Sequence, residues 1–60
     1  MLTLSGRQVW DCFKKLMPYQ AVNADRYTKE DRNRIKLSMK DGSYAYFTMC
    51  EDKYIYEKKL

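Results

Sequence analysis

The dipeptide Asp41-Gly42 separates two segments in which apolar and polar residues alternate. Such alternation is typical of a strand that buries one face. Asp-Gly favours the two-residue turn of a hairpin, because a type I′ turn needs positive φ at both central positions. The pattern therefore predicts an antiparallel hairpin whose first strand covers residues 34–40. A two-residue loop predicts the pairs Lys40–Ser43, Met39–Tyr44, Leu37–Tyr46 and Ile35–Thr48.

A third strand is expected after the hairpin. Glu51-Asp52 offers a second, weaker turn that leads into residues 53–57. With the register above, one face of this three-stranded meander is apolar and suits a core: Ile35, Leu37, Met39, Tyr44, Tyr46, Thr48 and Ile55. The opposite face combines basic, small and aromatic side chains: Arg34, Lys36, Ser38, Lys40, Ala45, Phe47, Met49, Tyr54 and Tyr56.

Residues 6–17 have the pattern of an amphipathic helix. Ser5 and Gln8 have the spacing of a capping box, and Leu4 and Val9 that of a hydrophobic staple. Pro18 is expected to end the helix, because the residue before a proline avoids the helical region. At about 100° per residue, the apolar side chains fall on one face: Val9, Trp10, Cys12, Phe13, Leu16 and Met17.

The segment between helix and hairpin is ambiguous. Residues 19–27 fit a short edge strand or an extended connection. A helix over residues 29–39 would place only Ile35 and Met39 on a common face, so the strand interpretation is preferred there. The sequence thus predicts a single α+β domain over residues 1–60, in which one N-terminal helix packs on a three-stranded antiparallel meander.

Composition argues against several classes of protein. The chain has 60 residues, two cysteines and no histidine. Cys12 and Cys50 allow one disulfide at most and cannot by themselves complete a zinc site. Without histidine the usual general base near neutral pH is missing, so we expect no catalysis and no cofactor. No apolar run approaches the ~20 residues of a membrane span. We therefore expect no membrane contact and a cytoplasmic location.

The charge distribution points to an anionic partner. The net charge is +4, and residues 25–40 carry six basic against three acidic side chains. Lysine and arginine beside exposed aromatic rings are typical of sheets that bind single-stranded nucleic acid, in which bases stack on the rings and the cations neutralise the backbone. The leading hypothesis is therefore a small nucleic-acid-binding regulator. Its predicted site residues are Arg34, Lys36, Lys40, Phe47, Tyr54 and Tyr56.

Three alternatives compete for the same face. Residues 18–27 could cover it as ordinary core, with Tyr19, Val22 and Tyr27 as a lid. It could form a homodimer, which would add to the thin core of so short a chain. It could also dock another protein, as in the small regulators and inhibitors that bacteriophages and mobile elements encode. Tyrosine, phenylalanine, methionine and arginine are enriched at such interfaces.

Overall fold

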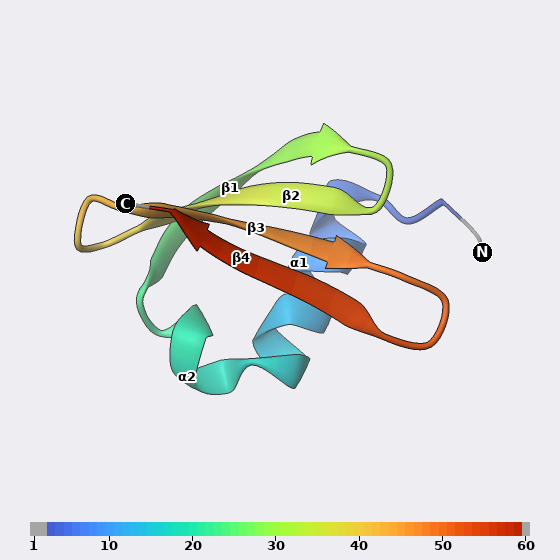
Figure 1. Ribbon diagram of the computed structural model, residues 1–60, viewed down its shortest axis with the longest axis horizontal. Helices are drawn as coiled ribbons and strands as arrows, with labels where there is room; N and C mark the ends of the chain where they lie inside the picture. The colour runs from blue at the N-terminus through green and yellow to red at the C-terminus, as the bar shows by residue number, and fades with distance from the viewer. Residues whose placement is uncertain (1–2, 60) are drawn as a thin grey trace.

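The computed structural model describes residues 3–59, which form two helices and a four-stranded sheet (Figure 1). The helices are α1 (Gly6–Leu16) and the single-turn α2 (Pro18–Ala21). The strands are β1 (Ala24–Asp31), β2 (Arg34–Met39), β3 (Tyr44–Met49) and β4 (Tyr54–Lys59). Each strand pairs antiparallel with the next, in the order β1-β2-β3-β4. The α+β class is confirmed, whereas the expected three strands are four.

Helix α1 begins and ends as its sequence predicts. The Ser5 hydroxyl accepts the Gln8 N–H at 3.1 Å, and the Gln8 side chain accepts the Ser5 N–H at 2.8 Å. This capping box satisfies donors that the first turn leaves without partners. Met17 leaves the helical conformation, and Pro18 then starts α2, where its fixed φ suits a first helical position.

Strand β1 is the element that the sequence located least well. It begins at Ala24 and ends at Asp31, so it starts later and runs further than the expected edge strand over residues 19–27. Its pairing with β2 shifts twice, between Ala24 and Arg26 and between Lys29 and Asp31. Each bulge breaks the period of two, so the strand shows no alternation along its length. Apart from Ala24 and the half-buried Tyr27, its residues are exposed.

Asn33 closes the turn between β1 and β2. Its φ of 55° lies in the left-handed region, which asparagine tolerates better than most residues. The Asn33 side chain is buried and accepts the Leu4 N–H at 2.6 Å. This bond attaches the segment that precedes α1 to the sheet.

The loop between β2 and β3 contains three residues, and this corrects the predicted register. The Met39 N–H donates to the Ser43 carbonyl at 3.0 Å, and the Gly42 N–H donates to the Met39 carbonyl at 3.1 Å. Lys40, Asp41 and Gly42 therefore form the loop, and Gly42 takes the left-handed position with φ 91°. A turn that is closed by such a hydrogen bond between residues three apart, and that ends in a left-handed glycine, is the usual three-residue hairpin loop. The predicted two-residue loop is wrong.

The extra loop residue turns β3 over relative to the prediction. Ile35 pairs with Phe47, Lys36 with Tyr46, Leu37 with Ala45 and Ser38 with Tyr44. A slip of one residue moves every side chain of a strand to the other face. Because β4 pairs with β3, its side chains change face as well: Phe47 pairs with Tyr56, and Met49 with Tyr54.

The core lies between α1 and one face of the sheet. Phe13 of α1 meets Phe47 of β3 edge-to-face, with ring centroids 5.2 Å apart, and both side chains are fully buried. Trp10 stacks on Tyr27 of β1 at 5.0 Å. The buried apolar residues are Val9, Phe13, Ala24, Ile35, Leu37, Met39, Ala45 and Phe47.

Two neighbouring alanine substitutions test this register. Phe47→Ala removes a fully buried ring and should lower the free energy of unfolding by about 3–5 kcal/mol. Tyr46→Ala removes a half-exposed ring on the other face and should cost about 1 kcal/mol, mostly through its contact with Arg34. Urea unfolding of both variants measures the difference. Equal losses, or the reverse order, would contradict the observed register.

The loop also gives the fold a defined acid sensitivity. The Ser43 hydroxyl and N–H donate to Asp41, and with a smaller contribution from Lys58 they lower the pKa of Asp41 from 3.8 to about 2. A lowered pKa means that the carboxylate stabilises the fold above pH 3.8, and that this contribution is lost as the pH falls towards about 2.

Thermal unfolding of the wild type and Asp41→Asn against pH measures this effect. The wild type should have the higher Tm at neutral pH, and the difference should shrink as the pH falls from about 4 to about 2. Two Tm curves that stay parallel through this interval would show that the Asp41 carboxylate does not stabilise the loop.

Candidate nucleic-acid interface

Both helices pack against the same face of the sheet, so the other face is open (Figure 1). We call this second surface the open face. Its members follow from the strand registers, since directly opposed residues share a face. They are Arg26, Thr28, Arg34, Lys36, Ser38, Tyr44, Tyr46, Thr48, Ile55, Glu57 and Lys59, with Asp31 at the end next to Arg34.

Two cation–ring pairs occupy the centre of the open face. The guanidinium carbon of Arg34 lies 4.4 Å from the centroid of the Tyr46 ring, and the Lys36 Nζ lies 4.7 Å from that of Tyr44. The two rings meet edge-to-face, with centroids 5.8 Å apart. All four side chains are half-buried although no helix covers them. Side-chain contacts within the face therefore hold them in place.

The basic groups at the centre differ from those at the margins. Arg26 lies 3.9 Å from Asp25, and Lys59 lies 3.9 Å from Glu57. Among residues 3–59 no carboxylate forms an ion pair with Arg34 or Lys36. The Arg34 Nε is buried without an acceptor among the described residues. The centre of the open face therefore carries two positive charges beside two aromatic rings, and neither charge forms an ion pair with a carboxylate of residues 3–59.

The structure separates the six residues that the sequence predicted as a site. Arg34 and Lys36 lie together on the open face, as expected. Lys40 is exposed in the β2–β3 loop, where its N–H donates to the Asn23 carbonyl at 2.7 Å. Phe47 is a fully buried core residue, so no partner can stack on it in this fold.

Tyr54 and Tyr56 lie on the helix side of the sheet. Tyr54 stacks on Phe47 with centroids 5.4 Å apart, and Tyr56 stacks on Phe13 at 6.2 Å. The aromatic residues that accompany the basic strand are instead Tyr44 and Tyr46. Sequence reasoning placed these two in the core. Gly42 does not distinguish the two outcomes in the sequence, because a glycine with positive φ fits a two-residue and a three-residue hairpin loop alike.

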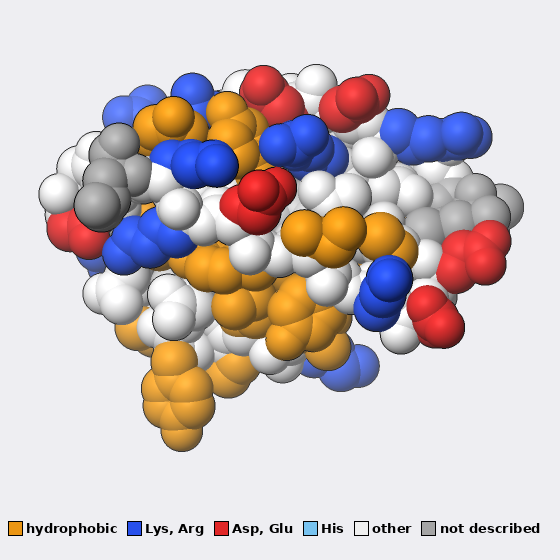
Figure 2. All heavy atoms as spheres, viewed as in Figure 1, with side chains coloured by type: hydrophobic (Ala, Val, Ile, Leu, Met, Phe, Trp, Pro, Cys, Tyr) orange, Lys and Arg blue, Asp and Glu red, His pale blue; other side chains and the backbone are white. Residues whose placement is uncertain are grey.

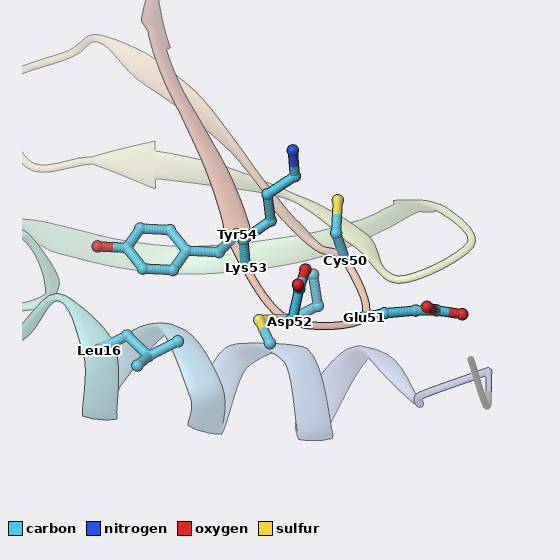
Figure 3. A pocket seen from close by; sticks show the side chains of 7 residues that line it. Leu16, Cys50, Glu51, Asp52, Lys53 and Tyr54 are labelled. Carbon is cyan, nitrogen blue, oxygen red and sulfur yellow. The ribbon is translucent and has the colours of Figure 1, made fainter.

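A second exposed surface is apolar and lies over β4 and the helices, where Figure 2 shows hydrophobic side chains gathered. Tyr19 is 87% exposed, Val22 67%, Leu16 44% and Tyr54 41%. Leu16 and Tyr54 face one another across a hollow of about 510 Å³ between the end of α1 and the β3–β4 turn (Figure 3). Cys50 and Lys53 of the β3–β4 turn also line this hollow.

Other site chemistry is sparse in the described part of the chain. Cys12 and Cys50 are half-buried free thiols. Residues 3–59 bring no three potential metal ligands together. Neither helix has the length and apolar character needed to cross a bilayer, and this holds for every residue that the structure describes.

Comparison of the chain with protein-family models, curated proteins and solved structures gives no match. The functional argument therefore depends on the geometry of the two exposed surfaces.

Proposed function

We propose that this chain is a small, non-catalytic module that binds single-stranded nucleic acid on the open face. The observation that supports the proposal is the centre of that face, where Arg34 and Lys36 lie over Tyr46 and Tyr44 without a carboxylate partner. A ligand that is both anionic and aromatic matches this arrangement. Nucleotides have both properties.

Binding would exchange partners within each cation–ring pair. In the free protein the cations lie over the ring faces at 4.4 and 4.7 Å. Phosphate groups attract Arg34 and Lys36 more strongly than a neutral ring does, since charge-assisted hydrogen bonds replace a weak contact. The exposed ring faces of Tyr44 and Tyr46 then become available to bases. Arg26 and Lys59, which lie beside Asp25 and Glu57 at the margins, contribute less to binding than the two central cations.

Single strands fit this surface better than duplexes do. Stacking on a protein ring requires a base that has left its own stack. Duplex reading uses an element that enters a groove, usually a helix or a two-stranded ribbon. The open face is the broad side of a four-stranded sheet, which is neither a helix nor a two-stranded ribbon. The proposal therefore specifies single-stranded RNA or DNA, with little dependence on sequence.

Fluorescence anisotropy with labelled single-stranded and duplex oligonucleotides tests the proposal. We expect binding to single strands that weakens steeply with salt, as counterion release requires. Tyr44→Ala or Tyr46→Ala should each cost about 1–3 kcal/mol of binding free energy, which is roughly a 5- to 150-fold loss of affinity. Arg34→Gln should weaken binding and flatten its salt dependence.

The matched control is Tyr19→Ala, because Tyr19 is an exposed aromatic residue of α2, away from the open face. This variant should bind like the wild type. Absence of binding at low salt would exclude the proposed function. Equal losses for Tyr19→Ala and Tyr46→Ala would place the contact elsewhere on the protein.

A further inference from the structure

The two edges of the sheet differ in how well they resist pairing with another strand. The β1 edge is interrupted by two bulges and carries charged residues along most of its length. Bulges and charges are the usual protection of an edge strand. Strand β4 pairs with β3 in an unbroken register and begins with Tyr54, Ile55 and Tyr56. The first half of β4 is therefore a regular, apolar edge that has neither a bulge nor a charged residue to protect it.

The hydrogen-bond pattern shows which groups this edge offers. The Cys50 N–H donates to the Lys53 carbonyl at 2.8 Å, so Lys53 directs its backbone groups towards β3. Inward and outward directions alternate along an antiparallel strand. Tyr54, Tyr56 and Lys58 therefore direct their N–H and C=O groups away from the sheet. A partner strand would have to pair with these three residues.

We propose that the β4 edge binds the β4 edge of a second copy, antiparallel, around a two-fold axis at Ile55. In this register Ile55 faces the partner's Ile55, and Tyr54 exchanges backbone hydrogen bonds with the partner's Tyr56. Lys53 then lies opposite the partner's Glu57. Asp52, in the β3–β4 turn, lies near the partner's Lys58. With the axis at Ile55, each charged residue of segment 52–58 therefore lies opposite a residue of the other sign in the second copy.

Neighbouring registers lack this complementarity. An axis at Tyr56 brings Lys53 opposite the partner's Lys59. An axis at Glu57 brings the two Glu57 carboxylates together, and an axis at Lys58 does the same for two ammonium groups. Like charges directly opposite one another destabilise a strand pair. An axis at Tyr54 brings Glu51 opposite the partner's Glu57. Charge therefore selects Ile55 among the registers that the outward backbone groups allow.

The proposed pairing also covers part of the exposed apolar surface. Tyr54 lies opposite the partner's Tyr56, and directly opposed residues share a face, so the helices of both copies lie on the same side. The apolar surface of one copy, with Leu16 and Tyr54, then adjoins that of the other (Figure 2). Ile55, which is 45% exposed in the single chain, becomes covered.

This dimer does not depend on nucleic-acid binding, although it would join the two open faces into one continuous surface. A two-strand contact is at the small end of specific interfaces, below about 1,200 Å² in total. We therefore expect association in the micromolar to millimolar range.

Sedimentation equilibrium with charge variants tests the proposal and its register together. Lys53→Glu places two glutamates opposite one another at each end of the pair, and Glu57→Lys places two lysines there. Each single variant should weaken self-association by about tenfold or more. The double variant Lys53→Glu/Glu57→Lys restores opposite charges and should associate like the wild type. An equimolar mixture of the two single variants should form heterodimers.

Lys15→Glu, on the exposed side of α1, is the control for net charge and should leave association unchanged. Circular dichroism verifies that each variant is folded. Heterodimers in the mixture of the two single variants would show the same, because misfolded chains would not associate. A wild type that stays monomeric to millimolar concentration would overturn the proposal. So would a dimer that neither single variant weakens, or one that the double variant does not restore.

Discussion

The three-residue loop Lys40-Asp41-Gly42 is the constraint on which the arrangement of both faces depends. Its length places Ile35 opposite Phe47 and thereby directs Phe47 into the core and Tyr46 to solvent. Gly42 can take the left-handed conformation without strain, and Asp41 accepts two hydrogen bonds from Ser43. Since β4 follows β3 in an unbroken register, the same loop decides which tyrosines meet the helix.

A domain of one sheet and one short helical layer leaves much of its surface uncovered. Helix α1 packs mainly on β1, β2 and β3, so it protects neither the open face nor the outer edge of β4. These two regions differ in chemistry, since one is cationic and aromatic and the other apolar with balanced charges. Each therefore suits a different kind of partner. Ion pairs among exposed residues add little to stability, so both regions can bind without a large cost to the fold.

The elements fixed by local interactions were predictable from the sequence. The capping box and Pro18 define α1, and the alternation of β2 correctly assigns Ile35, Leu37, Arg34 and Lys36 to their faces. The face of the sheet on which each β3 side chain lies was not predictable in this way. In the first part of β3, the side chains of both faces are apolar or aromatic: Tyr44 and Tyr46 on one face, Ala45 and Phe47 on the other. Hydrophobicity therefore does not select a register. The basic half of the candidate site, Arg34 and Lys36, was therefore identified from the sequence. Its aromatic half, Tyr44 and Tyr46, was not. Strand β1 was expected only as a possible edge strand over residues 19–27, and its bounds were not predictable because its two bulges remove the alternation.

The register between β2 and β3 can be measured directly by nuclear Overhauser spectroscopy of the labelled protein. In a pair that forms no backbone hydrogen bonds, the two α-protons are the closest atoms across an antiparallel sheet. The structure predicts strong cross-peaks between the α-protons of Lys36 and Tyr46, and between those of Ser38 and Tyr44. A strong cross-peak between the α-protons of Leu37 and Tyr46 instead would mean a two-residue loop. It would return Tyr44 and Tyr46 to the core and remove the basis of the proposed binding face.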